Sequence, residues 1–352
     1  PILSLDASYM IQPKIGYIRV NRFGATTAEE FKKAMKSLQQ QGMKDLILDL
    51  QGNGGGYLNA AIDLANEFLG QKELIVYTEG RTAQRSEFFA KGNGEFRDGR
   101  LIVLVDEYTA SASEIVSGAV QDWDRGIIVG RRSFGKGLVQ RPIDLPDGSM
   151  IRLTIARYYT PAGRCIQKPY DSSTDYNKDL IDRFNHGELM NADSIHFPDS
   201  LKVQTKKLKR TVYGGGGIMP DYFVPIDTTL YTDYHRKLVG KGVIIKFTMK
   251  FIEDHRKELA DKYKKFESFN EKFVIDDDML ATLREMGEKE GVKFNEEQYQ
   301  KALPLIKTQL KALIARDLWD MNEYFRVMNT TNESVQKALE ILRSGEYQKK
   351  LK

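Results

Sequence analysis

The first half of the chain alternates short apolar runs with helical stretches, and this alternation limits the folds available to it. Nearly continuous apolar strands that are separated by helices are typical of an α/β core. We therefore predict an α/β core from Ile15 to about Gln167. The expected strands cover residues 16–20, 45–50, 101–105, 126–129 and 150–154, and the expected helices begin at Thr27, Asn59 and Ser111.

The rest of the chain follows a different pattern. Residues 168–212 are polar and rich in turn-forming residues, which predicts an insertion, and the sequence past Pro225 has helical periodicity. We predict one domain over 1–230, with the insertion at 168–212, and a mainly helical C-terminal region over 231–352. A chain of 352 residues, 41% of them hydrophobic, can bury a core in each.

Charge and cysteine content narrow the classes of function. A formal net charge of +4, with both signs mixed along the chain, gives no argument for a nucleic-acid partner. Cys165 is the only cysteine, so we expect no intramolecular disulfide framework. No apolar run reaches the roughly 20 residues that a spanning helix requires, so we expect no transmembrane segment.

A serine stands where an expected strand meets an expected helix. The strand ends at Val105, and Ser111 opens the helix with Glu114 at the spacing of a capping box. A serine at such a junction is exposed at the sheet edge, and the amide of Ala112 lies at the positive helix end, where it can stabilise an oxyanion. Taken alone, however, Ser-x-x-Glu is most often only a helix cap.

A nucleophilic serine needs a base, and the expected α/β core contains no histidine, since the first in the chain is His186. A lysine can serve if burial or a nearby positive charge lowers its pKa. The candidate is Lys136, which lies between Gly135 and Gly137. A surface lysine in a glycine turn is the commoner reason for such a sequence.

The same segment raises a rival interpretation, because Gly130 to Lys136 has the spacing of a phosphate-binding loop. Gly137 stands where that loop needs a serine or threonine to ligate magnesium, and Pro142 opposes the helix that should follow. We therefore reject nucleotide binding.

A glycine-rich turn follows the strand that ends at Leu50. Backbone without side chains can approach a ligand closely and offer N–H groups to it. One amide of this turn, with Gly55 as the first choice, can supply a second oxyanion donor, although a tight strand-to-helix turn explains the glycines equally well.

These segments together closely resemble the carboxy-terminal processing peptidases, the tail-specific proteases of the S41 type. The resemblance implies a core like that of the crotonase and Clp-peptidase superfamily, built from repeated strand-strand-helix turns. It also implies a serine endopeptidase that cleaves unfolded or C-terminally tagged polypeptides, without metal or organic cofactor, in the periplasm or cell envelope. The matching motifs lie, in order, at 48–56, 110–115, 134–137 with Gln140, 159–163 with 166–167, and 216–221.

The resemblance also assigns roles to individual residues. A straight strand would hold the Cα atoms of residues 136 and 140 about 13 Å apart, so a role for Gln140 beside the lysine requires a bend. The roles are Ser111 as nucleophile in preference to Ser113, Lys136 as general base, Gln140 as the residue that orients the lysine, and the amides of Ala112, Gly54, Gly55 and Gly56 as the oxyanion hole.

The chain departs from the family pattern in three places. Gln51 and Gly54 replace a common arginine and proline, and residues 168–212 interrupt a usually short link. The PDZ domain that normally precedes the core has no counterpart here, as expected of a processed product whose upstream sequence is missing. A gated or inactive peptide-binding relative and a crotonase-like acyl-thioester enzyme therefore stay open as alternatives, as do a homo-oligomer and a regulatory partner.

Overall fold

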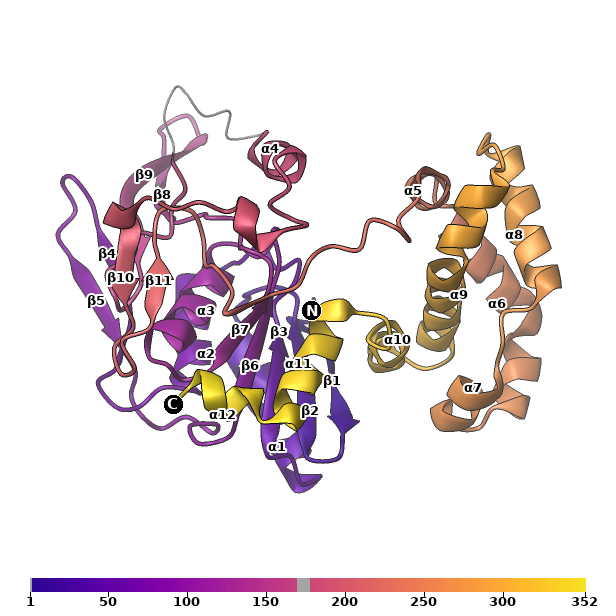
Figure 1. Ribbon diagram of the computed structural model, residues 1–352, viewed down its shortest axis with the longest axis horizontal. Helices are drawn as coiled ribbons and strands as arrows, with labels where there is room; N and C mark the ends of the chain where they lie inside the picture. Colours follow the sequence, from indigo (N-terminus) through magenta and orange to yellow (C-terminus); the bar gives the residue numbers. More distant parts are fainter. Residues whose placement is uncertain (1, 170–177) are drawn as a thin grey trace. The chain divides into compact units, whose positions relative to one another are not determined.

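The computed structural model describes residues 2–169 and 178–352, which form two compact units (Figure 1). Pro1–Pro225 and Lys337–Lys352 make the first unit, and Ile226–Gln336 make the second. Each unit has its own cluster of buried hydrophobic residues. We predicted 231–352 as one helical region, whereas the structure groups the last part of that region with the first unit.

A six-stranded sheet forms the centre of the first unit, in the order β1-β2-β3-β6-β7-β12. β1 runs antiparallel to β2, and all other neighbours are parallel. Every residue of β3, β6 and β7 is buried, which explains why these strands are almost continuously apolar in sequence. The strands are β1 (Leu5–Gln12), β2 (Ile15–Val20), β3 (Asp45–Asp49), β6 (Leu101–Val105), β7 (Ile127–Gly130) and β12 (Tyr222–Phe223).

Three helices complete the core of the first unit. α1 (Thr27–Gln40), α2 (Leu58–Asn66) and α3 (Ala112–Asp122) contribute apolar faces to the same cluster as the sheet, with Phe31, Leu64 and Val116 fully buried. The chain begins with a strand-strand-helix turn, β1-β2-α1. The predicted fold class, an α/β core with an appended helical region, is confirmed.

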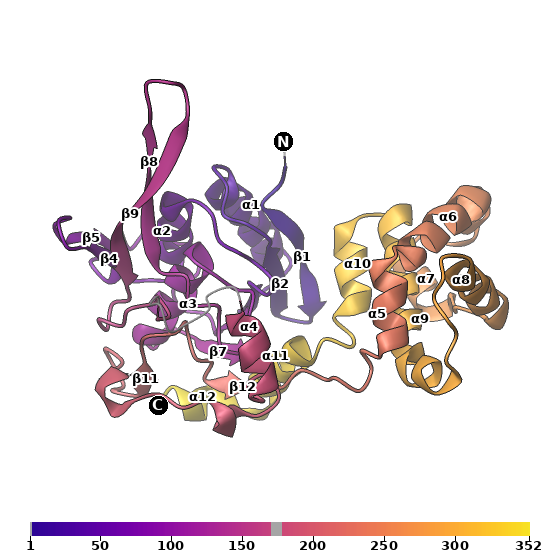
Figure 2. The same cartoon turned by 90° about the horizontal axis from the view of Figure 1, so that it is seen from above.

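A second, antiparallel sheet has the order β5-β4-β9-β8. β9 (Met150–Tyr159) pairs with β4 (Leu74–Glu79) only from Arg157 to Tyr159, and β4 pairs on its other side with β5 (Ser86–Phe89). The remainder of β9 pairs with β8 (Leu138–Asp144) alone. The result is a two-stranded hairpin, largely exposed, that extends away from the rest of the unit (Figure 2).

Part of the predicted insertion, residues 170–177, lies outside the described residues. The rest of 168–212 contains α4 (Asp179–Asn185), two short 3₁₀ turns and the antiparallel pair β10 (Lys202–Gln204) and β11 (Thr211–Tyr213).

The end of the chain returns to the first unit. α11 (Glu333–Ser344) leads into α12 (Glu346–Lys350), where the hydroxyl of Tyr347 accepts a hydrogen bond from the Leu101 amide at 3.0 Å. Arg100 donates to the Leu342 carbonyl at 2.8 Å. These contacts fix the last helices at the start of β6, and no local sequence pattern foretold them.

The second unit is entirely helical in its regular structure. Within residues 2–169 and 178–352, no helix is both long and apolar enough to span a membrane. The helices of this unit are α5 (Asp233–Gly240), α6 (Val243–Lys262), α7 (Phe266–Lys272), α8 (Asp277–Lys289), α9 (Glu296–Leu318) and α10 (Met321–Met328).

Candidate active site

Ser111 lies at the turn between β6 and α3, where it forms the N-cap of the helix. Its backbone has φ 57° and ψ −115°, a region that a residue with a Cβ atom adopts only at a cost in free energy. Such strain concentrates at functional turns, and here it leaves the serine partly exposed at the end of a buried strand. The structure thus places Ser111 at the strand-to-helix junction that its sequence predicted.

Glu114 is the centre of the hydrogen-bond network around this turn. Its carboxylate is fully buried and accepts from the Ser111 amide at 2.8 Å and the Lys136 amide at 2.8 Å. It also accepts from Ser133 Oγ at 2.5 Å and the Gly135 amide at 2.7 Å. Burial raises the pKa of Glu114, and these four donors oppose that rise. One side chain therefore ties the backbone of the candidate nucleophile to the backbone of the candidate base.

The sequence indicated Glu114 only as the partner of a helix cap. Its wider role depends on residues 133–136, which no local pattern connects to α3. The available signal was a carboxylate in the otherwise apolar and small-residue stretch from Ala112 to Val116. A charge in such a stretch needs buried partners.

Ser113, the other serine of the motif, has a different environment. It is fully buried, and its hydroxyl donates to the Asn53 carbonyl at 3.0 Å. This hydrogen bond joins α3 to the glycine-rich turn. Ser113 thus has a packing role, whereas Ser111 is partly exposed.

The glycine-rich turn packs directly on Ser111. A Cβ atom at Gly55 would lie 2.7 Å from Ser111 Cβ and 2.9 Å from the Ala112 nitrogen, and the backbone there has φ +100°. Only glycine fits both the space and the conformation. The turn therefore borders the space into which an oxyanion beside Ser111 would project.

The first-choice oxyanion donor of the sequence analysis is already engaged, since the Gly55 amide donates to Asn53 Oδ1 at 2.8 Å. Within the described parts of the chain, the amides of Gly54, Gly56 and Ala112 have no acceptor. These three N–H groups remain available to a ligand.

Hydrogen bonds to β2 and to the loop after β6 hold the turn in place. Asn53 donates to the Val20 carbonyl at 2.8 Å, and Asp106 accepts from the Gly52 amide at 2.9 Å. Burial raises the pKa of Asp106. The turn is thereby attached to both β2 and the loop after β6.

Arg19 is a residue of this region that the sequence analysis missed. It extends from β2, binds the buried Asp49 at 2.6 Å and donates to the Gln51 carbonyl at 2.8 Å. The guanidinium of Arg19 therefore holds the glycine-rich turn at Gln51, the position where the family pattern usually has an arginine. No sequence pattern indicated this role for Arg19, because only the parallel pairing of β2 with β3 brings the residue next to the glycine-rich turn.

The side chain of Lys136 is exposed although its backbone is fixed. The amide of Gly137 donates to Gln167 Oε1 at 2.9 Å, next to the bond from Lys136 to Glu114. Among residues 2–169 and 178–352, no hydrogen bond joins Lys136 Nζ to Ser111 Oγ, and the lysine side chain is in solvent. The structure brings the two backbones together without joining the two functional groups.

Gln140 is also exposed and lies at a register shift between β8 and β9. The shift falls between Val139 and Gln140, so the irregularity that the sequence analysis required is present. In this arrangement the side chain faces solvent.

The predicted insertion braces the loop that carries Lys136. Arg183 of α4 is buried and donates to the Ser133 carbonyl at 3.2 Å and to the Arg132 carbonyl at 2.7 Å. Burial and the nearby Arg132 lower the pKa of Arg183 to about 10. Lys168 contributes a bond from its amide to the Gly135 carbonyl at 3.0 Å, and burial lowers the pKa of its ammonium group.

The last sequence motif, 216–221, packs behind the same loop. The Ile218 amide donates to Ser133 Oγ at 2.6 Å, and the Ser133 amide donates to the Ile218 carbonyl at 3.1 Å. Asp221 accepts from the Ile128 amide at 2.8 Å, which places β12 beside β7. Motifs far apart in the sequence therefore converge on Ser133 and Glu114.

Comparison with known proteins identifies the region that contains this site. Residues 14–174 match the sequence model of peptidase family S41. Over this range the α/β unit is similar in sequence to peptidase family S41. The match contains the Ser111 turn, the glycine-rich turn and Lys136, so every residue of the predicted site lies within the S41-matched region.

Several relatives share this S41 region. A carboxyl-terminal-processing protease of Picosynechococcus is 45% identical over 44% of this chain and 37% of its own length. A chloroplastic C-terminal processing peptidase of Tetradesmus obliquus is 40% identical over 44% of this chain and 33% of its own length. The solved photosystem II D1 C-terminal processing protease aligns with a TM-score of 0.45 and 30% identity, covering 61% of this chain and 43% of that one. The chain spans about a third of the length of these curated relatives.

The helical unit matches a different sequence model. Residues 234–320 match the sequence model of a family of unknown function, DUF8443. This match covers α5 to α9 and assigns no activity to them.

Proposed function

We propose that the chain is a serine endopeptidase that uses Ser111 as its nucleophile and Lys136 as its general base. The observation that carries the proposal is the strained, partly exposed Ser111 beside the unengaged Ala112 amide and the glycine-rich turn. A nucleophile at a helix N-terminus with backbone donors next to it is the arrangement that acyl transfer requires.

In the proposed reaction, Ser111 Oγ attacks the carbonyl carbon of a peptide bond while neutral Lys136 accepts the hydroxyl proton. The oxyanion binds the Ala112 amide and the amide of Gly54 or Gly56. The carbon–nitrogen bond then breaks, and Lys136 returns its proton to the leaving amine. Water attacks the acyl-enzyme with Lys136 again as base, which releases the carboxylic acid and restores Ser111.

This mechanism requires the Lys136 side chain to turn from solvent toward Ser111. Glu114 already binds the backbone amides of both residues, which supports such a movement of the side chain. Gln140 would then orient the ammonium group from β8, and the reaction needs no metal or organic cofactor. The substrates we propose are polypeptides that are unfolded or carry a C-terminal tag, and the relatives are named for C-terminal processing. The bacterial and chloroplast origin of these relatives is compatible with a periplasmic or cell-envelope location.

The test is hydrolysis of fluorescently labelled casein by the parent chain and by Ser111→Ala. We expect the variant to lose at least about a thousandfold in rate, since no other group supplies the nucleophile. Ser113→Ala is the matched control, because its hydroxyl serves only the bond to Asn53 and its rate should stay within a few-fold of the parent. Full activity of Ser111→Ala would contradict the proposal and point to chemistry without a serine nucleophile.

A second candidate function is a gated or inactive peptide-binding relative, and the exposed side chain of Lys136 favours it. In that case the parent, Ser111→Ala and Ser113→Ala are equally inert towards casein. Activity that appears only when an added PDZ domain is fused upstream would identify a gate, and persistent inactivity would identify a binding protein.

A further inference from the structure

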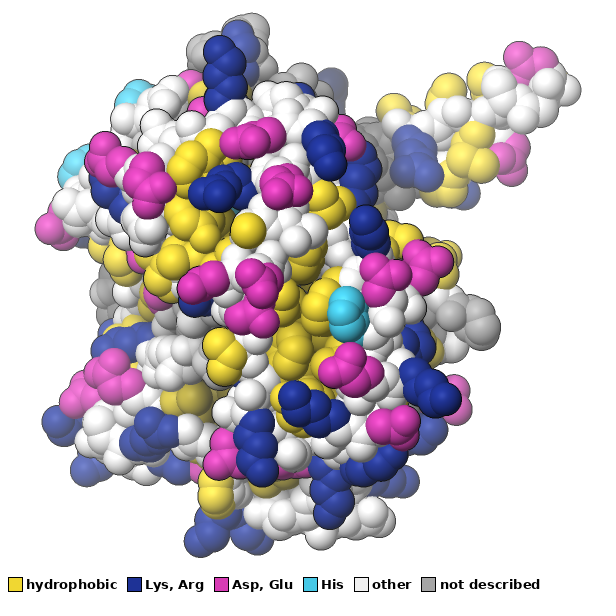
Figure 3. All heavy atoms as spheres, turned by 90° about the vertical axis from the view of Figure 1, so that its right-hand side faces the viewer, with side chains coloured by type: hydrophobic (Ala, Val, Ile, Leu, Met, Phe, Trp, Pro, Cys, Tyr) yellow, Lys and Arg dark blue, Asp and Glu magenta, His cyan; other side chains and the backbone are white. Residues whose placement is uncertain are grey.

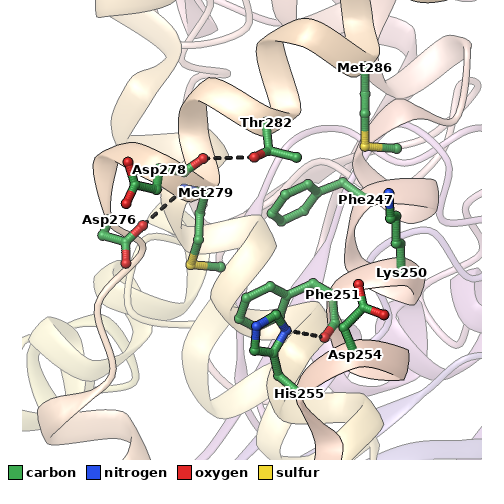
Figure 4. A pocket seen from close by; sticks show the side chains of 10 residues that line it. All are labelled: Phe247, Lys250, Phe251, Asp254, His255, Asp276, Asp278, Met279, Thr282 and Met286. Atoms are coloured by element: carbon green, nitrogen blue, oxygen red, sulfur yellow. Dashed lines mark hydrogen bonds between the residues drawn. The ribbon is translucent and has the colours of Figure 1, made fainter.

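Helices α6 and α8 of the second unit enclose a cavity of about 380 Å³ that opens to solvent (Figure 4). This volume lies at the lower end of the range for ligand-binding pockets, which is about 300–1,000 Å³. The face that carries these helices has a patch of hydrophobic side chains with charged side chains of both signs around it (Figure 3). The cavity lies outside the S41 region and within the DUF8443 match.

The floor of the cavity is apolar and partly built from methionine. Phe247 is 3% exposed and Met279 is 7% exposed, while Phe251 and Met286 are partly exposed. On each helix the lining residues recur three, four, seven or eight positions apart, which puts them on one face. Methionine side chains adapt to irregular partners, so this floor suits an apolar side chain from outside.

The rim of the cavity carries an excess of negative charge. Asp254, Asp276 and Asp278 line it against a single cation, Lys250. His255 stacks on Phe251 with ring centroids 4.5 Å apart, and its Nδ1 lies 3.0 Å from the Phe251 carbonyl. Since a carbonyl only accepts, Nδ1 carries the proton in the neutral ring. The rim therefore favours a ligand with positive charge.

We propose that this groove docks an amphipathic helix of a partner polypeptide, with apolar residues on one face and lysine or arginine at its flanks. From Phe247 to His255 the α6 wall is about 12 Å long at 1.5 Å per residue, which matches two turns of a docked helix. The walls are helices, so they offer no free strand edge. An extended peptide would leave its backbone groups unpaired there, whereas a helix satisfies its own.

The test uses a synthetic helical peptide with leucine at positions i, i+3, i+4 and i+7 and lysine at both flanks. Its binding to the full chain is measured by fluorescence anisotropy, with Ser111→Ala in all proteins to prevent cleavage. We expect micromolar binding, and about tenfold weaker binding of the same peptide with glutamate at the flanks. The double variant Asp254→Lys/Asp278→Lys should reverse this preference.

The control is Glu253→Lys, which adds the same charge change on α6 at an exposed position outside the cavity. It should change the affinity less than twofold. Equal binding of the lysine and glutamate peptides, or equal effects of Glu253→Lys and of the double variant Asp254→Lys/Asp278→Lys, would overturn the proposal. A change in sedimentation with the groove variants but no peptide binding would overturn it as well, and would point to a second copy as the occupant.

Discussion

The two halves of the candidate site differ in how the fold supports them. On the nucleophile side, Glu114 is fully buried and accepts four hydrogen bonds, two of them from the backbones of Ser111 and Lys136. On the base side, Lys136 and Gln140 extend into solvent, and the hairpin that follows is mostly exposed.

This difference separates a part of the site that buried hydrogen bonds hold in place from a part whose side chains can move. A buried carboxylate with four donors fixes the oxyanion region before any substrate arrives. The exposed side chain of Lys136, in the loop before the hairpin, has few contacts to lose when it moves. We infer that the base side, rather than the nucleophile side, responds to substrate or to a partner.

The largest expected effect comes from Glu114→Gln. The amide group can accept at only one oxygen, so at least two of the four buried donors lose their acceptor, at about 1–3 kcal/mol each. We therefore expect the free energy of unfolding to fall by about 2–6 kcal/mol, measured by chemical denaturation. Glu95→Gln, an exposed glutamate of the same unit, is the control and should stay within about 0.5 kcal/mol of the parent. An unchanged stability of Glu114→Gln would contradict the view that buried hydrogen bonds to Glu114 fix the nucleophile side more firmly than the base side.

Lys136→Met should separate activity from stability. The exposed side chain contributes little to folding, so the melting temperature should not change measurably, whereas loss of a general base typically costs about 10²–10⁴-fold in rate. The casein assay and a thermal melt measure the two quantities. Lys91→Met, at another exposed lysine, should alter neither. A marked drop in melting temperature for Lys136→Met would mean that the side chain is packed in solution, and unchanged hydrolysis would exclude it as the base.

The smallest expected effect concerns how the free energy of unfolding depends on pH. We expect opposite dependences on the nucleophile side and on the base side, tested with Asp106→Asn and Asp147→Asn. Burial raises the pKa of Asp106 on the nucleophile side, so its stabilising contribution is full below the unfolded pKa and is lost as pH rises through the folded one. Hydrogen bonds from Ser149 lower the pKa of Asp147 in the hairpin turn, so its contribution is present above the unfolded pKa and is lost as pH falls.

Denaturation midpoints between pH 3 and pH 8 measure both contributions. Relative to its variant, the parent should gain stability toward low pH at Asp106 and lose it toward low pH at Asp147. If the contributions of Asp106 and Asp147 to stability changed with pH in the same direction, the distinction between a buried nucleophile side and a solvated base side would be contradicted.

Much of the site was readable in the sequence. The apolar runs predicted the buried parallel strands, and the capping-box spacing placed Ser111 at the start of α3. Glycines at 54–56 predicted a backbone open to a ligand, which stays a prediction, and the structure packs Gly55 closely against Ser111. These features are local, because strand burial, helix starts and glycine conformations depend mainly on neighbouring residues.

Tertiary structure alone decided the rest. Glu114 became the centre of the site because residues 133–136 fold over α3, and Arg183 and Arg19 act across distances in the chain that no periodicity records. The engagement of the Gly55 amide by Asn53, the solvent exposure of Lys136 and the return of α12 to β6 are equally non-local. The physical reason is that the sequence fixes which groups must be buried or turned, whereas hydrogen-bond partners and side-chain exposure depend on which distant segments pack together.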